Sequence, residues 1–202
     1  MEDFGLYIIL TQPQLPHTVI AEKCVEHGIK MLQLREKHLP DRELIKIAKD
    51  LRGITRGTET QLVIDDRADI AAICGADFLH IGQSDMTIED ARTIVGDMQI
   101  GFSTHSIAQA KQALQRDDLA YIGFGPIYAT TTKAIPDNPV GTALLKEVLS
   151  FAHIPVVAIG GLFPENIKTV LDAGAKNYCL VRHFMQTLDF ERKLNEFKEL
   201  IK

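Results

Sequence analysis

The chain has 202 residues, of which 46% are hydrophobic and 24% charged, an ordinary composition for a globular protein with one sizeable core. Its formal net charge of −5 argues against a general nucleic-acid-binding protein, because such a protein needs a basic face to release counterions from phosphate. Three widely spaced cysteines, no basic leader and no apolar run of about 18 residues predict a soluble cytoplasmic chain without a membrane partner.

Eight short apolar runs alternate with segments whose apolar residues recur at helical spacing. The expected strands span residues 6–11, 30–34, 61–64, 78–81, 98–102, 121–124, 155–159 and 177–181. The expected helices span residues 18–27, 41–51, 67–74, 87–95, 106–114, 142–151, 164–173 and 190–201. Because each helix returns the chain to the same edge, the strands should be parallel, and eight such units predict a single α/β domain over residues 1–202, a closed (β/α)₈ TIM barrel. A doubly wound sheet is the alternative, but the turn after the first strand lacks the glycines expected there.

Polar residues follow the expected strands, where barrel enzymes place their chemistry. Gln33, Arg35 and Lys37 alternate along the end of the second strand and therefore share one face, on which they could hold a polyanion. The alternative is that Arg35 and Lys37 pair with Glu36 or with a neighbouring helix.

Carboxylates follow the next two strands. Asp65 and Asp66 come directly after the third strand and Asp85 follows the fourth, so the acids can converge at one edge of the sheet. Asp is also common in turns and at helix N-caps, and spacing alone leaves that alternative open. Cations and carboxylates in one barrel mouth would partly cancel each other unless Mg²⁺ with a di- or triphosphate lay between them.

The later loops add hydroxyls and glycines. The fifth strand ends in Ser103, and the longest connection, residues 125–141, carries several threonines and Lys133. A long loop of this kind is more often functional than structural filler. Gly160 and Gly161 follow the seventh strand, where barrels often bind phosphate, although a glycine pair also serves any tight turn.

The histidines contribute less to the expected site. His80 lies within a strand, where a packed and hydrogen-bonded imidazole is more common than a ligand. His105 and His183 lie at the expected strand ends and remain candidates.

Six motifs occur across most of the chain in the order typical of one family. They are QLREK (33–37), DDRADIA (65–71), HIGQSD (80–85), STHS (103–106), GPIYATTTK (125–133) and AIGGL (158–162). With these motifs the chain resembles thiamine phosphate synthase, a barrel transferase. The resemblance implies that hydroxymethylpyrimidine pyrophosphate and hydroxyethylthiazole phosphate are joined to give thiamine phosphate and pyrophosphate.

The resemblance also implies roles for individual residues. Asp66 and Asp85 would hold Mg²⁺. The pyrophosphate would be surrounded by Gln33, Arg35, Lys37, Ser103 and Lys133, and the thiazole phosphate by Thr130, Thr132 and the Gly161 amide. Arg35, Ser103 and Lys133 would be the catalytic side chains, because they stabilise the leaving pyrophosphate while a pyrimidinyl-methyl cation forms and the thiazole nitrogen captures it.

Three positions depart from the family pattern. Asp65 replaces the usual Asn and so adds a negative charge to the substrate-binding set. Ile135 lies two residues after Lys133, where an Asp is common. The chain reads CLVRHF from Cys179 to Phe184 instead of a small Ser- and Ala-containing turn. Arg182 could therefore replace backbone donors to the thiazole phosphate by charge pairing, or the second substrate could differ.

Two other functions remain as alternatives. The thiazole tautomerase branch of the same family tends to carry a catalytic His where this chain has Pro126. A non-catalytic protein that binds a thiamine precursor would have no need for Asp66, Asp85 and Lys133 together. The sequence therefore favours a synthase acting on small molecules, and it leaves the oligomeric state open.

Overall fold

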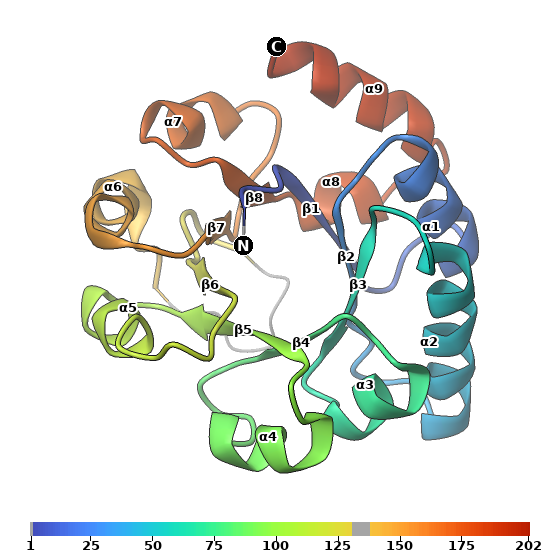
Figure 1. Ribbon diagram of the computed structural model, residues 1–202. Helices are drawn as coiled ribbons and strands as arrows, with labels where there is room; N and C mark the ends of the chain where they lie inside the picture. Colours follow the sequence, from blue (N-terminus) through green and yellow to red (C-terminus); the bar gives the residue numbers. More distant parts are fainter. Residues whose placement is uncertain (1, 131–137) are drawn as a thin grey trace.

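The computed structural model describes residues 2–130 and 138–202. In this part of the chain, eight parallel strands pair in sequence order and close into a barrel that the helices surround (Figure 1). The barrel closes where β1 pairs with β8, with Leu6 opposite Tyr178 and Tyr7 opposite Cys179. The predicted (β/α)₈ barrel is therefore confirmed.

Each expected strand and helix is found, with small shifts at its ends. The strands are β1 (Leu6–Leu10), β2 (Met31–Leu34), β3 (Gln61–Asp65), β4 (Phe78–Ile81), β5 (Gln99–Thr104), β6 (Tyr121–Phe124), β7 (Val156–Ile159) and β8 (Asn177–Cys179). The helices are α1 (His17–Glu26), α2 (Asp41–Thr55), α3 (Ala68–Cys74), α4 (Ile88–Val95), α5 (Ile107–Ala113), α6 (Gly141–Phe151), α7 (Ile167–Asp172), α8 (Val181–Met185) and α9 (Phe190–Leu200).

Local signals set several of these ends. The hydroxyls of Thr87 and Ser106 accept hydrogen bonds from backbone N–H groups three residues on, and so begin α4 and α5. Gly75 ends α3 in the left-handed conformation, with a φ of 66°. These caps satisfy backbone groups that a helix end would otherwise leave unpaired.

Helix α8 was not expected. The apolar run that begins at residue 177 predicts a strand to residue 181, but β8 ends at Cys179 and a five-residue helix follows. Phe184 and Met185 on this helix are buried, as are Asn177, Tyr178 and Cys179 of β8, so burial does not distinguish the two elements. The expectation that His183 lies at a strand end is therefore wrong, because His183 belongs to this helix, as does Arg182.

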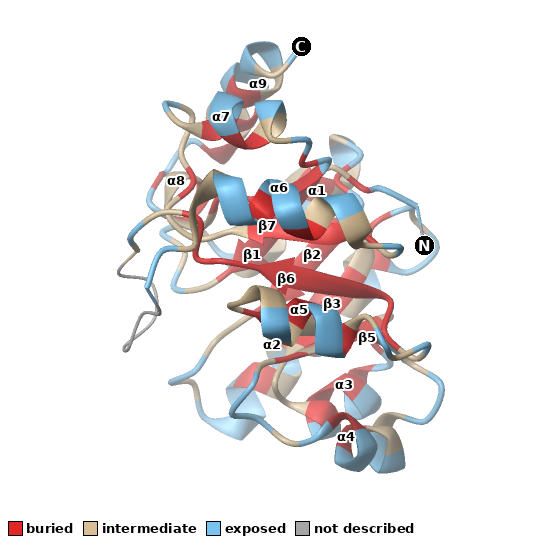
Figure 2. Ribbon diagram, turned by 90° about the vertical axis from the view of Figure 1, so that its left-hand side faces the viewer, coloured by how far each residue is buried: buried red, intermediate tan, exposed pale blue. Residues whose placement is uncertain are grey.

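Side chains alternate along the strands between the barrel interior and the surrounding helices. The interior cluster contains Phe4, Tyr7, Ile9, Met31, Val63, Phe78, Ala120, Tyr121, Val157 and Cys179. A larger cluster fills the space between strands and helices, and Figure 2 shows the buried strands enclosed by helices with exposed outer faces. None of the helices in the described ranges is long and apolar enough to cross a membrane.

Candidate active site

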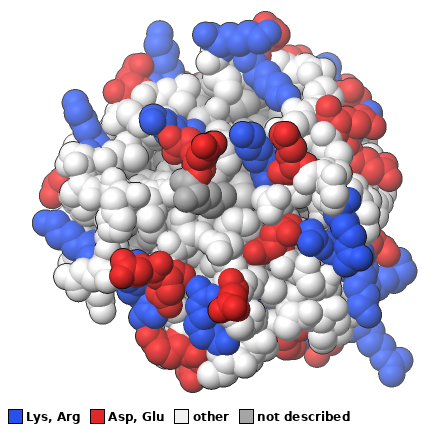
Figure 3. Space-filling view, in the orientation of Figure 1, with Lys and Arg blue, Asp and Glu red and all other residues white. Residues whose placement is uncertain are grey.

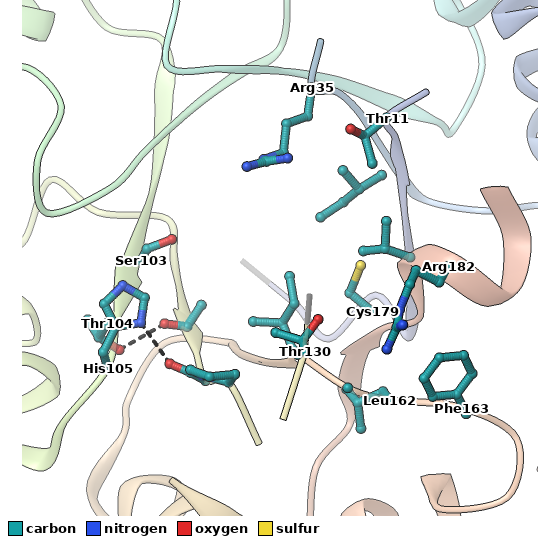
Figure 4. Close-up of a pocket in the computed structure, with 18 residues that line it drawn as sticks. Thr11, Arg35, Ser103, Thr104, His105, Thr130, Leu162, Phe163, Cys179 and Arg182 are labelled. Carbon is teal, nitrogen blue, oxygen red and sulfur yellow. Dashed lines mark hydrogen bonds between the residues drawn. The ribbon is translucent and has the colours of Figure 1, made fainter. Parts of the chain in front are cut away.

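A pocket lies at the carboxyl ends of the strands, the end where barrel enzymes hold their active sites. Its lining comes from six strand ends and includes Ile9, Thr11, Arg35, Ser103, Thr104, His105, Gly123, Gly125, Pro126, Thr130, Ile159, Gly160, Gly161, Leu162, Phe163, Cys179, Val181 and Arg182. Figure 4 shows Arg35 at the top, Ser103 and His105 on the left, and Arg182 beside Phe163 on the lower right. Residues far apart in the sequence thus face one space.

Five of the predicted site residues line this pocket: Arg35, Ser103, Thr130, Gly161 and Arg182. Lys37, Asp65, Asp66 and Asp85 lie outside its lining, on the loops after β2, β3 and β4 or at the end of β3. Thr132 and Lys133 fall outside the described residues.

Gln33 lies deeper than the sequence suggested. Its side chain points into the barrel interior, where it is only 2% exposed, and its Nε2 donates a hydrogen bond of 3.1 Å to the hydroxyl of Tyr7. Gln33 therefore lies beneath the pocket, and Arg35, which directly follows the end of β2, reaches the pocket itself.

Cations after β2 meet carboxylates after β3. Arg35 Nε and Lys37 Nζ each lie 3.3 Å from Asp65 Oδ2, and Lys37 also contacts Asp66 Oδ2. Glu36 is engaged elsewhere, because it accepts hydrogen bonds from the backbone of Gln12 and from His17. The strand register thus joins the QLREK and DDR motifs in one cluster, which we call the Asp65 cluster: Arg35, Lys37, Asp65 and Asp66.

Asp65 is buried in this cluster. Its side chain is 7% exposed, and Oδ2 accepts no hydrogen bond of normal geometry from the described residues. Burial raises the pKa of Asp65 above its ordinary value, while the charges of Lys37 and Arg35 counteract part of that rise. The negative charge of Asp65, which replaces the usual Asn of the family, is therefore held between Arg35 and Lys37.

The donor set beside this cluster suits a hard cation. Asp66 adopts a left-handed backbone conformation with a φ of 58°, and its N–H donates to the His80 carbonyl of the neighbouring strand. Asp85, after β4, accepts a hydrogen bond of 2.7 Å from the Gly82 N–H, and its charge is near enough to raise the pKa of Asp65 further. Mg²⁺ is usually held by one or two carboxylates together with substrate phosphate and water. Asp66 and Asp85 fit that requirement, although no three His, Cys, Asp or Glu side chains of the described ranges form a metal-binding group on their own.

The loops after β6 and β7 close the other side of the pocket. Tyr128 N–H donates to the Gly160 carbonyl at 3.0 Å. A side chain on Gly160 would place its Cβ 2.4 Å from that of Pro126, and one on Gly161 would lie 2.7 Å from the Ala129 carbonyl oxygen. Close packing of the two loops therefore requires both glycines, whatever else they bind.

Arg182 reaches the same side of the pocket from α8. Its guanidinium carbon lies 4.9 Å from the centre of the Phe163 ring, within the range of a cation–π contact. Phe163 follows the glycine pair and was not singled out from the sequence. His105 was a candidate from the sequence. Its Nδ1–H donates a hydrogen bond to the Gly125 carbonyl at 2.7 Å and so holds the start of the loop after β6.

Charges of both signs are interspersed over the face of the molecule shown in Figure 3. The distribution agrees with the overall charge of −5, since an anionic ligand must then find local cations rather than a basic surface. Arg35, Lys37 and Arg182 are such local cations.

The fold and this site define the class of the protein: a (β/α)₈ barrel whose strand ends carry cations, carboxylates and close-packed glycines around one pocket. Residues 6–184 match the family model described as thiamine monophosphate synthase, and the chain belongs to this family. The resemblance carried by the six motifs is thereby confirmed.

Individual relatives support the same assignment. A thiamine-phosphate synthase of Chloroflexus aurantiacus is 36% identical, with 98% of this chain and 93% of the relative covered. One of Halalkalibacterium halodurans is 35% identical and covers 100% of this chain and 97% of its own length. Among solved structures, a thiamine phosphate pyrophosphorylase from Pyrococcus furiosus aligns with a TM-score of 0.86 and 29% identity, over 98% of this chain and 96% of the other.

Proposed function

We propose that this protein makes thiamine phosphate by transferring the pyrimidinyl-methyl group of hydroxymethylpyrimidine pyrophosphate to the nitrogen of hydroxyethylthiazole phosphate. The observation that carries the proposal is the presence of cations on two sides of one pocket. Arg35 and Lys37 lie beside carboxylates suited to Mg²⁺, as a pyrophosphate site needs. Arg182 lies on the side of Gly160 and Gly161, where a monophosphate would bind.

The reaction breaks the bond between the methylene carbon and the pyrophosphate oxygen, and the electron pair leaves with pyrophosphate. The lone pair of the thiazole nitrogen then forms the new carbon–nitrogen bond, so no proton has to be removed. The protein must therefore stabilise the leaving group and position the nucleophile.

The residues of the chain divide these tasks. Arg35 and Lys37 place positive charge next to the leaving pyrophosphate, and the Ser103 hydroxyl donates to one of its oxygens. Asp66 and Asp85 would hold Mg²⁺, which when bound supplies further positive charge to the pyrophosphate. Lys133, outside the described residues, has the same role by family resemblance. Ile9, Ile159 and Cys179 provide apolar walls that keep water from the reactive methylene cation.

The test is to mix both precursors with the protein and Mg²⁺ and to follow pyrophosphate and thiamine phosphate together. Equal amounts of the two products are expected. A well-folded protein that forms neither would refute the proposal. Conversion of a thiazole tautomer without pyrophosphate release would support the tautomerase function instead, and binding without turnover would support a non-catalytic binding protein.

A further inference from the structure

A continuous chain of hydrogen bonds crosses the barrel beneath the pocket. Gln33 Nε2 donates to the Tyr7 hydroxyl at 3.1 Å, and the hydroxyls of Tyr7 and Tyr121 lie 2.9 Å apart. Tyr121 Oη is 2.9 Å from His80 Nδ1, and His80 Nε2 is 2.9 Å from Ser103 Oγ. The chain therefore connects β1, β2, β4, β5 and β6, and it ends on a hydroxyl that faces the pocket.

The Gln33 amide at one end fixes the direction of these hydrogen bonds. An amide nitrogen can only donate, so the Tyr7 oxygen accepts from Gln33. Buried hydroxyl hydrogens are almost always satisfied, which leaves Tyr7 donating to Tyr121, and Tyr121 donating to His80 Nδ1. The proton of a neutral His80 then lies on Nε2 and is donated to Ser103 Oγ.

The direction has a consequence for Ser103. Its oxygen accepts the hydrogen bond from His80 Nε2–H, so its own O–H is left to donate toward a ligand in the pocket. The opposite direction would have Ser103 donating to His80, and the oxygen would then present only lone pairs to an anionic substrate. The orientation of one serine hydroxyl thus depends on groups that lie outside the pocket lining.

The packing around Tyr121 is specific to this arrangement. Gly101 lies between His80 and Tyr121 in the strand register, and a Cβ at Gly101 would be only 2.1 Å from Tyr121 Cζ. The absence of a side chain at this position lets the Tyr121 ring cross β5 and stack on His80, with ring centres 5.5 Å apart. Tyr7 and Tyr121 are both buried and do not line the pocket.

We propose that Tyr7, Tyr121 and His80 are positioning residues that keep the Ser103 hydroxyl as a hydrogen-bond donor to the pyrophosphate substrate. This inference rests on the proposed function for the identity of the substrate, but the direction of the hydrogen-bond chain does not. The direction can therefore be tested even if the protein makes no thiamine phosphate.

The first experiment reads the tautomer of His80 directly. Nitrogen NMR of the full-length protein labelled with ¹⁵N-histidine, with the His80→Gln variant used for assignment, should show the proton of neutral His80 on Nε2. In Tyr121→Phe, which lacks the donor to Nδ1, a second population with the proton on Nδ1 should appear. A wild-type protein with the proton on Nδ1 would overturn the proposal.

The second experiment measures turnover. Tyr7→Phe and Tyr121→Phe should each lower kcat about tenfold, as expected for one misdirected hydrogen bond, and leave the KM for the thiazole phosphate unchanged. Tyr178→Phe is the matched control, because Tyr178 lies in the cluster outside the barrel and packs against Phe197. Wild-type kinetics in Tyr121→Phe, or an equal loss in Tyr178→Phe, would contradict a positioning role.

A pair of amide substitutions separates the two nitrogens of His80. Glutamine can place an N–H near the position of Nε2, so His80→Gln should retain the donor to Ser103 and much of the activity. Asparagine reaches only the position of Nδ1, so His80→Asn should keep the contact to Tyr121 and lose the activity. The reverse order of activities would show that the contact to Tyr121, not the donor to Ser103, is what matters. Circular dichroism and thermal melting confirm that each variant is folded.

Discussion

Replacing Asp65 by Asn tests how this site handles its unusual charge. Asp65 Oδ2 lies 3.3 Å from both Arg35 Nε and Lys37 Nζ, the two cations proposed to bind pyrophosphate. The carboxylate and the ligand therefore compete for the same positive charges. Asp65→Asn keeps the shape of the side chain and removes the competitor, so pyrophosphate should bind more tightly.

The size of the effect follows from this geometry. A phosphate oxygen in contact with the same cations on their far side would lie roughly 6 Å from the Asp65 carboxylate. Two unit charges at that separation repel by about 0.7 kcal/mol in water and by about 3 kcal/mol at an effective dielectric constant of 20. The Lys37 side chain is 41% exposed and that of Asp65 only 7%, so the true value lies between these limits. We expect affinity to rise about tenfold, which corresponds to about 1.4 kcal/mol.

Titration calorimetry with inorganic pyrophosphate and Mg²⁺ measures this change without requiring turnover. Asp118→Asn is the matched control, because Asp118 also pairs with two arginines, at 2.9 Å from Arg116 and 3.8 Å from Arg92, but lies ahead of β6 at the other end of the barrel. The control should bind pyrophosphate like the wild type. Unchanged or weaker binding by Asp65→Asn would refute the competition between carboxylate and ligand.

Three further predictions concern other parts of the molecule. Arg182→Ala should raise the KM for the thiazole phosphate roughly ten- to a hundredfold, because a charge-assisted contact is lost. Equal increases in KM for both substrates in steady-state kinetics would exclude a dedicated role of Arg182 in binding the thiazole phosphate. Gly123→Ala should fold normally, since its Cβ would lie 3.7 Å from the nearest atom, His80 Cε1. The added methyl group would enter the pocket and raise KM. An unchanged KM would show that no substrate reaches this point. Burial, followed by the charge of Lys193, lowers the pKa of His183 below its ordinary 6.5. The unfolded chain therefore binds a proton that the folded protein excludes, and the free energy of unfolding should fall as the pH drops below about 6.5. Denaturant unfolding at several pH values should show a smaller fall in His183→Gln than in the exposed-site control His153→Gln.

The fold was predictable because each repeat carries its own signals. Apolar runs of four to six residues followed by helical spacing recur eight times, and capping residues such as Thr87 and Ser106 mark the start of some of the helices. Helix α8 escaped prediction because five residues are too few to show a helical period. Its side chains Phe184 and Met185 are buried, so composition alone does not separate them from the strand before.

The site was predictable where it depends on strand alternation. Alternation places Arg35 toward the pocket and brings it to Asp65 on the adjacent strand. Alternation does not predict how deep a side chain lies along the barrel axis, because this depth depends on how the strands are staggered. For this reason Gln33 reaches Tyr7 instead of the pocket. The path from Tyr7 to Ser103 needs the register of several strands and the missing side chain at Gly101, none of which is visible in a single segment.

The Asp65 cluster and the neighbouring Asp85 together predict a strong dependence on metal. Among the described residues, the two cations of the cluster face its two carboxylates and that of Asp85, which leaves one excess negative charge before a metal binds. Pyrophosphate should therefore bind weakly without Mg²⁺, and its affinity should rise steeply as Mg²⁺ is added. Asp65→Asn removes the excess charge, so it should bind pyrophosphate measurably without metal and gain less from it.

The same titration with Asp85→Ala separates charge from ligation. This variant also loses one negative charge, but it loses a proposed Mg²⁺ ligand with it, so metal-free binding should improve while most of the gain from Mg²⁺ disappears. If Asp85→Ala and Asp65→Asn respond to Mg²⁺ in the same way, the two carboxylates act only through their charge and Asp85 does not hold the metal. If the wild type binds pyrophosphate equally well with and without Mg²⁺, the excess negative charge does not govern the site.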